Sequence, residues 1–400
     1  MIEHVIIRNY KSIRELELPL RRLNVLIGSN GVGKTNFISF FEMAKAIFEQ
    51  RFGSYTLESG GIDNLLYHGR KQSSEIYGLI DFNNTNAFYF NVKPTRSNKG
   101  YIDCAGDYVN TGNVQVGTNQ VEVNHEGTDQ VSGLYTTSIK EEEYLKPENL
   151  QRKDYDKWQK RVWDSGVEES SLIKQEQWKA GHLKSYLRSF SIYHFHDTTS
   201  TALMRGQCDI SDNRFLRPNG SNLASYLYML QQTDEKAFKL IEGTVSSIAP
   251  YFKKFKLRPD PLMPSKISLE WEEHDSDMYL DGYSFSDGTI RFIALATLLL
   301  QTNLPEVIII DEPEIGLHPA AINKLSALIK RASRKSQLII STQSSNLVNY
   351  FEPEDIVVVD REGGQAVFQR LNKEDLQVWM DEYNYTISDM WETNLIGGQL

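Results

Sequence analysis

The sequence predicts an α/β fold, and two groups of predicted elements at opposite ends of the chain carry that prediction. Residues 307–310, 338–340 and 356–359 are short, continuous apolar runs of the kind found in buried parallel strands. Between the first two runs, residues 319–333 place their apolar side chains on one helical face, which completes a strand–helix–strand unit. Near the N-terminus, residues 24–27 read as a half-buried strand that runs through a glycine-rich loop into a helical pattern.

Composition and charge limit the classes of protein that fit this sequence. The chain has 400 residues, of which 40% are hydrophobic and 24% charged, as in ordinary globular proteins. Its net charge of -10 argues against a general nucleic-acid coat, because affinity for phosphate backbones requires Lys and Arg at the surface. The longest mainly apolar stretch, residues 292–300, is shorter than the roughly 20 residues that cross a bilayer. No membrane partner is therefore expected. With two cysteines and no CxxC spacing, the sequence favours a reducing cytoplasm.

A phosphate-binding pattern lies between the first predicted strand and helix. Residues 28–35, GSNGVGKT, match GxxxxGK[ST]. Glycines let successive backbone amides face phosphate groups, Lys34 would reach the outer phosphates of ATP, and Thr35 would be a ligand of Mg²⁺. The expected nucleotide-binding residues are Asn30, Gly31, Val32, Gly33, Lys34, Thr35 and Asn36. The alternative interpretation is a glycine turn before a core helix.

Two carboxylates end the apolar run at residues 307–310. In an open α/β sheet, ligands bind at the carboxyl ends of the strands, where Asp311 and Glu312 fall. Asp311 is therefore expected to hold Mg²⁺ through water, and Glu312 to polarise the attacking water and accept its proton. The alternative is a solvated acidic strand end.

Ser286, Asp287 and Gly288 precede an apolar helical pattern over residues 290–300 and lie upstream of the two carboxylates. Alone, these residues are a good helix N-cap. Their order and spacing relative to the other motifs make them resemble the signature segment of ABC ATPases. In that family the corresponding serine, glycine and helix N-terminus bind the γ-phosphate held by the opposite subunit, which is a reason to dimerise.

Gln343 follows the next apolar run, where related ATPases usually have a histidine near the γ-phosphate. Its amide can hydrogen-bond a phosphate oxygen or the attacking water, but it cannot take up a proton near neutral pH. His318 occupies the position of a loop that crosses to the partner subunit in relatives. A capped helix start is the alternative for His318.

Together with the opening IRNYKSIRELEL, these four motifs resemble the RecF/SMC/OLD-like branch of ABC ATPases. Longer blocks, including SDGTIRFIALATLLLQTNLPEVIIIDEPEIGLHPAA and the closing MWETNLIGGQL, resemble bacterial AAA-type ATPases of the stand-alone kind, which lack a nuclease domain. The resemblance implies a P-loop NTPase of the ABC-ATPase head type, with two lobes and a helical and β insertion. It also implies a homodimer that sandwiches ATP and hydrolyses it.

Relatives of this kind are often encoded beside nucleases or phage-defence genes. The implied function is therefore an ATPase that dimerises around ATP and regulates a nuclease or other effector in anti-phage defence or DNA metabolism. Only about 40 residues follow Asp360, so we expect any nuclease to be a separate chain. One alternative is a DNA-binding repair ATPase of the RecF type, against which the acidic charge argues. Another is a transporter subunit, against which the opening segment and the insertion argue.

The predicted organisation has four parts. Residues 1–92 hold the phosphate loop, and residues 93–189 form an insertion that is rich in strands and turns and then helical over about 140–188. Residues 190–280 return to the head through helices and strands. Residues 281–400 form a C-terminal lobe with the signature segment, the carboxylates and Gln343.

Three weaker patterns each have a structural alternative. His194, His196 and Asp197 could form a metal site, although structural packing is favoured. Basic residues at 253–258 with Arg331, Arg334 and Lys335 could face DNA, although a solvated surface is favoured. Arg8 and Lys11 could contact the nucleotide, although a strand and turn in the core explain them equally well.

Overall fold

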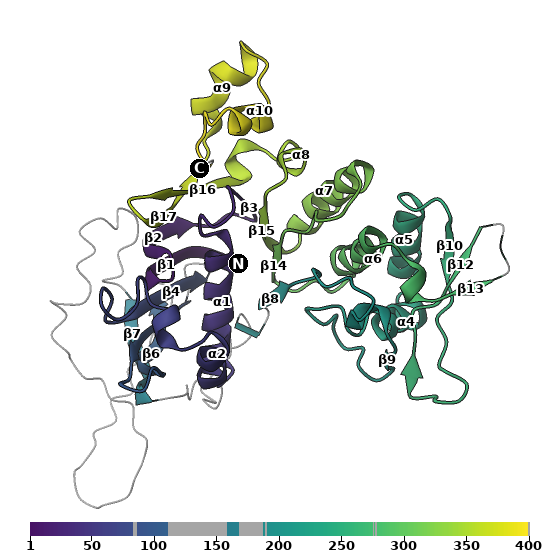
Figure 1. Ribbon diagram of the computed structural model, residues 1–400, viewed down its shortest axis with the longest axis horizontal. Coiled ribbons are helices and arrows are strands. Elements are labelled where there is room, and N and C mark those ends of the chain that lie inside the picture. Colours follow the sequence, from purple (N-terminus) through teal and green to yellow (C-terminus); the bar gives the residue numbers. More distant parts are fainter. Residues whose placement is uncertain are drawn as a thin grey trace, which may run out of the picture.

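The computed structural model describes residues 1–82, 86–110, 158–167, 187–188, 190–274, 276 and 278–398. Within these residues the chain has two large β-sheets, and Figure 1 shows helix α1 beside both of them in the N-terminal part. The helices α4 to α7 and several short strands lie on the other side of the second sheet (Figure 1).

The first sheet is antiparallel throughout, in the order β2-β1-β4-β5-β6-β7. Its strands are β1 (Ile2–Tyr10), β2 (Ile13–Pro19), β4 (Ile76–Phe82), β5 (Asn86–Pro94), β6 (Gly100–Asn110) and β7 (Trp158–Val167). Most pairs of neighbours are joined by short connections, as expected for antiparallel strands.

The second sheet has the order β17-β16-β3-β15-β14-β8, and every pair except β16–β17 is parallel. Its strands are β3 (Leu23–Ile27), β8 (Phe190–Tyr193), β14 (Val307–Asp311), β15 (Gln337–Thr342), β16 (Ile356–Glu362) and β17 (Gln365–Arg370). Strand β15 lies between β3 and β14, so the carboxyl ends of these three strands meet at one edge.

The apolar runs of this sheet are buried on both faces. Ile308, Ile310 and Ile340 belong to the core that faces α6 and α7, whereas Ile309 and Ile339 belong to the core that faces α1. Because successive strand residues point to opposite faces, a sheet covered on both sides needs such continuous apolar strands.

Helix α1 (Lys34–Phe48) fills the space between the two sheets. Phe37, Phe40 and Phe41 are fully buried there and make edge-to-face contacts with one another. The same core includes residues of both sheets, so α1 holds the first sheet against the second. Helix α2 (Phe52–Glu58) follows it.

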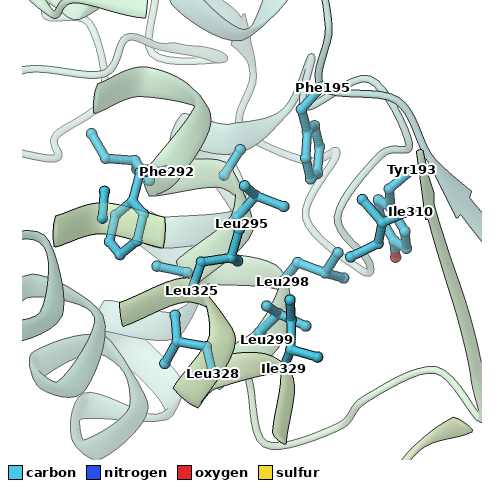
Figure 2. Close-up of a cluster of buried hydrophobic side chains, with 14 of the residues drawn as sticks. Tyr193, Phe195, Phe292, Leu295, Leu298, Leu299, Ile310, Leu325, Leu328 and Ile329 are labelled. Atoms are coloured by element: carbon cyan, nitrogen blue, oxygen red, sulfur yellow. The ribbon is translucent and has the colours of Figure 1, made fainter. Parts of the chain in front are cut away.

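Helices α6 (Asp287–Leu300) and α7 (Pro319–Ser333) cover the other face of the second sheet. Figure 2 shows Phe292, Leu295 and Leu298 of α6 among Leu325, Leu328 and Ile329 of α7, beside Ile310 of β14. Beyond α6 lie two helices and two small sheets: α4 (Leu223–Thr233), α5 (Glu235–Ser246), the strands β10 (Phe252–Phe255), β12 (Trp271–Glu273) and β13 (Tyr279–Leu280), and the pair β9 (Cys208–Asp209) and β11 (Lys266–Ile267).

The C-terminal helices are α8 (Ser345–Val348), α9 (Lys373–Asp381) and α10 (Ile387–Glu392). Figure 1 shows α9 and α10 together, beyond strand β16. Helix α10 packs against α8, which begins two residues after Gln343. The C-terminal helices therefore lie close to the carboxyl end of β15.

The structure corrects one prediction in the insertion. The helical prediction for residues 140–188 is wrong at β7, which is a strand paired with β6; the polar composition of this stretch carries no alternation that marks an edge strand. The remaining prediction for 140–188 falls on residues outside the described set, apart from 187–188. Residues 190–280, predicted to contain helices and strands, include helices α4 and α5. No helix in the described part of the chain is long and apolar enough to span a membrane.

Candidate nucleotide-binding site

The phosphate loop, residues 28–35, connects β3 to α1. Gly28, Gly31 and Gly33 have φ angles of 151°, 81° and 128°, which side chains rarely allow. A Cβ at Gly28 would lie 2.3 Å from the carbonyl oxygen of Val359, and one at Gly33 would lie 2.6 Å from the Cβ of Ala366. Glycine is therefore required because strands β16 and β17 approach the loop closely.

Lys34 is the first residue of α1 and is only 5% exposed. Its Nζ donates to the carbonyl oxygens of Gly28 at 2.5 Å and Ser29 at 2.9 Å, so the ammonium folds back over its own loop. Burial lowers the pKa of Lys34, while the carboxylates of Glu312 and Asp311 act in the opposite direction. The lysine thus faces the carboxylates at the end of β14.

Asp311 and Glu312 lie at the carboxyl end of β14. Asp311 is 7% exposed and accepts a hydrogen bond from the hydroxyl of Ser341 on β15. Glu312 has a left-handed backbone with φ of 44°, and its amide donates to the carbonyl oxygen of Ser341 at 3.0 Å. This turn re-aims the Glu312 side chain, whose carboxylate accepts a hydrogen bond from the amide of Gln343.

Glu314 is a third carboxylate close to Asp311 and Glu312, and it was not among the residues predicted from the sequence. It is 7% exposed, and one of its oxygens accepts from the Thr342 hydroxyl at 2.5 Å and the Gln343 amide N–H at 3.2 Å. The other oxygen is buried and has no hydrogen-bond partner among the described residues. Burial raises the pKa of Glu314. The signal was present as an acidic residue directly after Pro313, but only the fold buries it.

The signature segment, Ser286 to Gly288, begins α6. Ser286 is the N-cap residue, and its hydroxyl accepts from the amide of Thr289 at 3.2 Å. A Cβ at Gly288 would lie 2.4 Å from the carbonyl oxygen of Gly316. No hydrogen bond or ion pair in the described parts of the chain joins this segment to the phosphate loop.

The residues at the carboxyl ends of β3, β14 and β15 suit a nucleotide with a divalent cation. The loop supplies backbone amides and one buried ammonium, and Asp311 offers a second carboxylate oxygen beyond the one bonded to Ser341. Together with Glu312 and Glu314, the cluster has more negative than positive charge, which a magnesium ion would offset. Thr35 is exposed at the start of α1 and would be the second ligand.

Comparison with known proteins assigns the chain to a family. A family model described as "AAA domain, putative AbiEii toxin, Type IV TA system" matches residues 120–349, more than half of the chain. The chain belongs to this AAA family. The matched residues include the signature segment, the carboxylates and Gln343, and the phosphate loop precedes them. No curated protein matches the sequence.

Two solved structures of SMC heads share the fold of this AAA domain. One is an SmcHead bound to the C-winged helix domain of ScpA, with a TM-score of 0.56 and 14% identity over 94% of this chain and 99% of that one. The other is an Smc head with an extended coiled coil, bound to the C-terminal domain of ScpA from Pyrococcus furiosus, with a TM-score of 0.55 and 12% identity over 96% and 99%. The predicted ATPase-head fold and the predicted AAA-type family are confirmed.

Two buried arginines of the AAA domain organise the signature segment, and both were missed in the sequence. Arg205 is 4% exposed and donates to the carbonyl oxygens of Gly282 and Phe285 and to the carboxylate of Asp287 at 2.9, 2.7 and 2.6 Å. Arg291, also 4% exposed, donates to the carbonyl oxygens of Phe195, His196 and Ile315. Apart from the Asp287 carboxylate, the partners named here are backbone carbonyls distant in sequence, so no local pattern marks the two arginines.

His194 and His196 each have a hydrogen-bond partner among the described residues. His194 pairs with Glu42 at 2.9 Å, and this hydrogen bond raises the pKa of His194. His196 contacts the carbonyl oxygen of Asp311 at 2.8 Å. The described residues contain no group of three or more His, Cys, Asp or Glu side chains that could hold a metal. The favoured alternative, structural packing, fits these contacts.

The basic cluster at residues 253–258 is partly neutralised by carboxylates of residues 270–272. Lys253, Lys254 and Lys256 all lie within 4 Å of the Glu272 carboxylate, at 3.7, 3.4 and 2.8 Å. Arg258 pairs with Glu270 at 3.5 Å. These ion pairs reduce the positive charge open to a phosphate backbone, which favours a solvated charged face.

The remaining predicted contacts have local roles. His318 caps α7, since its Nδ1 accepts from the amide of Ala320 at 3.3 Å, as a capped helix start requires. Lys11 donates to the hydroxyl of Ser39 at 2.9 Å, and Arg8 lies 3.4 Å from Glu15. Asn36 donates to the hydroxyl of Ser12 at 2.7 Å, which ties α1 to the turn after β1.

Proposed function

We propose that the protein binds ATP with Mg²⁺ and hydrolyses it, and that two copies enclose the nucleotide. One observation carries the proposal: the carboxyl ends of β3, β14 and β15 place Lys34, Asp311, Glu312 and Gln343 at one edge of the sheet. Phosphate-binding amides, a cation, a metal-binding carboxylate and a general base are the parts that phosphoryl transfer to water requires.

In this mechanism the phosphate loop holds the β- and γ-phosphates through its backbone amides, and Lys34 exchanges its two carbonyl partners for phosphate oxygens. Magnesium, held by Thr35 and Asp311, would neutralise charge on the phosphates. Glu312 takes the proton of the attacking water while the bond from the γ-phosphorus to the bridging oxygen breaks, giving ADP and phosphate. Gln343 fixes the orientation of Glu312 by donating a hydrogen bond to it, and does not take part in proton transfer.

The proposed dimer rests on the surface around the signature segment. Leu203, Tyr283 and Ile315 are 62%, 53% and 42% exposed. Tyr283 lies in a short helix next to that of Leu203, and Ile315 precedes Gly316, whose carbonyl oxygen faces Gly288. Burying this apolar surface against the phosphate loop of a second copy would place Ser286 and the N-terminus of α6 at the γ-phosphate.

The proposed cellular role is ATP-dependent control of a protein effector, such as a nuclease, in phage defence or DNA metabolism. The family description names a putative AbiEii toxin and a type IV TA system, which supports a defence role. The SMC heads with this fold were solved with a domain of ScpA, which supports a protein partner for a head of this kind.

Light scattering of the Glu312→Gln variant tests the proposal. With ATP and Mg²⁺, this variant should bind ATP without turnover and form a stable dimer, and adding Ser286→Arg should abolish the dimer because the long cation occupies the interface. Glu306→Gln, the same change at an exposed position, should turn over ATP like the wild type. A Glu312→Gln variant that hydrolyses ATP at the wild-type rate, or that stays monomeric with ATP bound, would contradict the proposal.

A further inference from the structure

The segment from α10 to Gly398 reaches the phosphate loop from the far end of the chain. The amide of Ser29, in the phosphate loop, donates to the carbonyl oxygen of Gly398 at 2.8 Å. This contact uses the closing sequence MWETNLIGGQL, which the proposed chemistry otherwise leaves without a role. This hydrogen bond therefore attaches the phosphate loop to a segment that is distant in sequence, in addition to the covalent connection of the loop to α1.

Gly398 is held in place from the second sheet. Its amide donates to the carboxylate of Asp360 on β16 at 3.0 Å. Its φ is 81°, and a Cβ there would lie 2.9 Å from a methyl group of Val358 and 3.4 Å from the Cα of Gly28. Only glycine allows the chain to lie this close to the loop without a shift.

The other end of the segment is attached next to Gln343. The amide of Ser388, in α10, donates to the side-chain oxygen of Asn349 at 2.9 Å, directly after α8. Met390 and Trp391 are buried, and a capping box formed by Thr386 and Asp389 fixes the start of α10. The segment thus spans from the end of β15 to the phosphate loop.

We propose that residues 387–398, here called the C-terminal brace, position the phosphate loop for ATP and connect it to the segment that carries Gln343. This inference rests on the proposed function. A loop that is already ordered loses less conformational entropy when it binds a ligand, so the brace raises affinity for ATP. Because Ser29 and Gly398 do not touch the reacting atoms, the brace acts on nucleotide binding more than on the chemical step.

Two variants release the brace by different routes. Gly398→Ala adds a methyl group at a left-handed position with no room, and Asp360→Ala removes the acceptor of the Gly398 amide without backbone strain. Gly363→Ala is the matched control, because Gly363 also has a left-handed φ, of 57°, but no atom within 4 Å of its Cβ position. The control carries the same backbone strain without touching the brace.

Hydrogen exchange of the Ser29 amide in nucleotide-free protein reports the brace directly, and equilibrium binding of ATP with Mg²⁺ reports its effect. We expect faster exchange at Ser29 and about a tenfold higher Kd for ATP in both variants, with kcat within about twofold of wild type. Gly363→Ala should match the wild type in both measurements.

The two measurements separate this inference from the proposed function. Unchanged exchange at Ser29 in both variants, or faster exchange with a wild-type Kd, would overturn the brace. If wild-type protein and Lys34→Ala alike bind no ATP, the proposed function fails, and the brace as a device for ATP fails with it. If Gly398→Ala does not fold, Asp360→Ala gives the same test without added bulk.

Discussion

The side-chain amide of Gln343 donates a hydrogen bond to the carboxylate of Glu312, across the carboxyl ends of β15 and β14. Since an amide cannot take up a proton near neutral pH, the role proposed for Gln343 is to orient Glu312, the proposed proton acceptor. The backbone N–H of Gln343 donates in turn to Glu314 at 3.2 Å. The glutamine is thus held between two carboxylates, one partly accessible and one buried.

Removing the amide should therefore affect the chemical step. We expect Gln343→Ala to lower kcat by about tenfold or more with little change in the Kd for ATP, because Glu312 loses its orienting donor. Steady-state phosphate release and equilibrium ATP binding measure the two quantities. Gln369→Ala, at an exposed position on β17, is the control and should behave like the wild type. A wild-type kcat in Gln343→Ala would show that Glu312 needs no partner.

Glu314 should make stability depend on pH. Its folded-state pKa is raised above the ordinary value of 4.5 by burial, so its stabilising contribution is complete below about pH 4.5 and is lost as pH rises through the folded-state pKa. Glu314→Gln stays neutral and retains an oxygen for Thr342 and Gln343. The variant should therefore gain stability relative to wild type as pH rises, by about 1 kcal/mol.

Urea unfolding at about pH 5 and about pH 8 measures this difference. Glu314→Ala is the contrast, because it leaves the Thr342 hydroxyl and the Gln343 amide without their acceptor and should destabilise the protein at both pH values. An advantage of Glu314→Gln that shrinks as pH rises would mean that Glu314 is charged and stabilising in the folded protein.

Local sequence patterns were sufficient for the parts of the fold and site that lie within one strand, loop or helix. The runs at β14, β15 and β16 were identified because a sheet covered on both faces requires continuous apolar strands. The phosphate loop was identified because its glycines meet a local requirement, namely positive φ angles and close approach. Glu312 and Gln343 were identified from their positions directly after β14 and β15, and Lys34 from its place in the phosphate loop.

What the sequence did not reveal depends on contacts between distant segments. Strand β7 has no apolar alternation of its own, and its pairing with β6 defines it. Arg205 and Arg291 are surrounded by carbonyl groups from other segments, and a buried arginine has no distinct local pattern. Gly398 likewise meets Ser29 only through the tertiary structure, because the two residues lie near opposite ends of the sequence.

Arg205 should contribute strongly to the stability of the region around the signature segment. Its guanidinium serves the carbonyl oxygens of Thr198, Gly282 and Phe285 as well as Asp287, a fork that the single ammonium of lysine cannot reproduce. We expect Arg205→Lys to lower the free energy of unfolding by about 2 to 3 kcal/mol, measured by urea denaturation.

Arg217 supplies the matched control for this substitution. It pairs with Asp212 at 3.0 Å with nearly half of its side chain exposed, so Arg217→Lys should cost less than about 1 kcal/mol. Equal effects of the two changes would mean that the carbonyl groups around Arg205 find other partners, and that the arginine does not shape the signature segment.

The contact between Gly288 and the loop that contains Gly316 gives the last prediction. A methyl group at position 288 would lie 2.4 Å from the carbonyl oxygen of Gly316, and Arg291 holds the adjacent carbonyl of Ile315, so the loop cannot yield freely. We expect Gly288→Ala to cost about 2 kcal/mol of stability and to abolish the ATP-dependent dimer in a Glu312→Gln background, as light scattering would measure. Gly243→Ala, at an open position in α5, should be neutral or stabilising by up to about 1 kcal/mol. If Gly288→Ala is as stable as Gly243→Ala and still dimerises, close packing of α6 on this loop is not what sets the geometry of the signature segment.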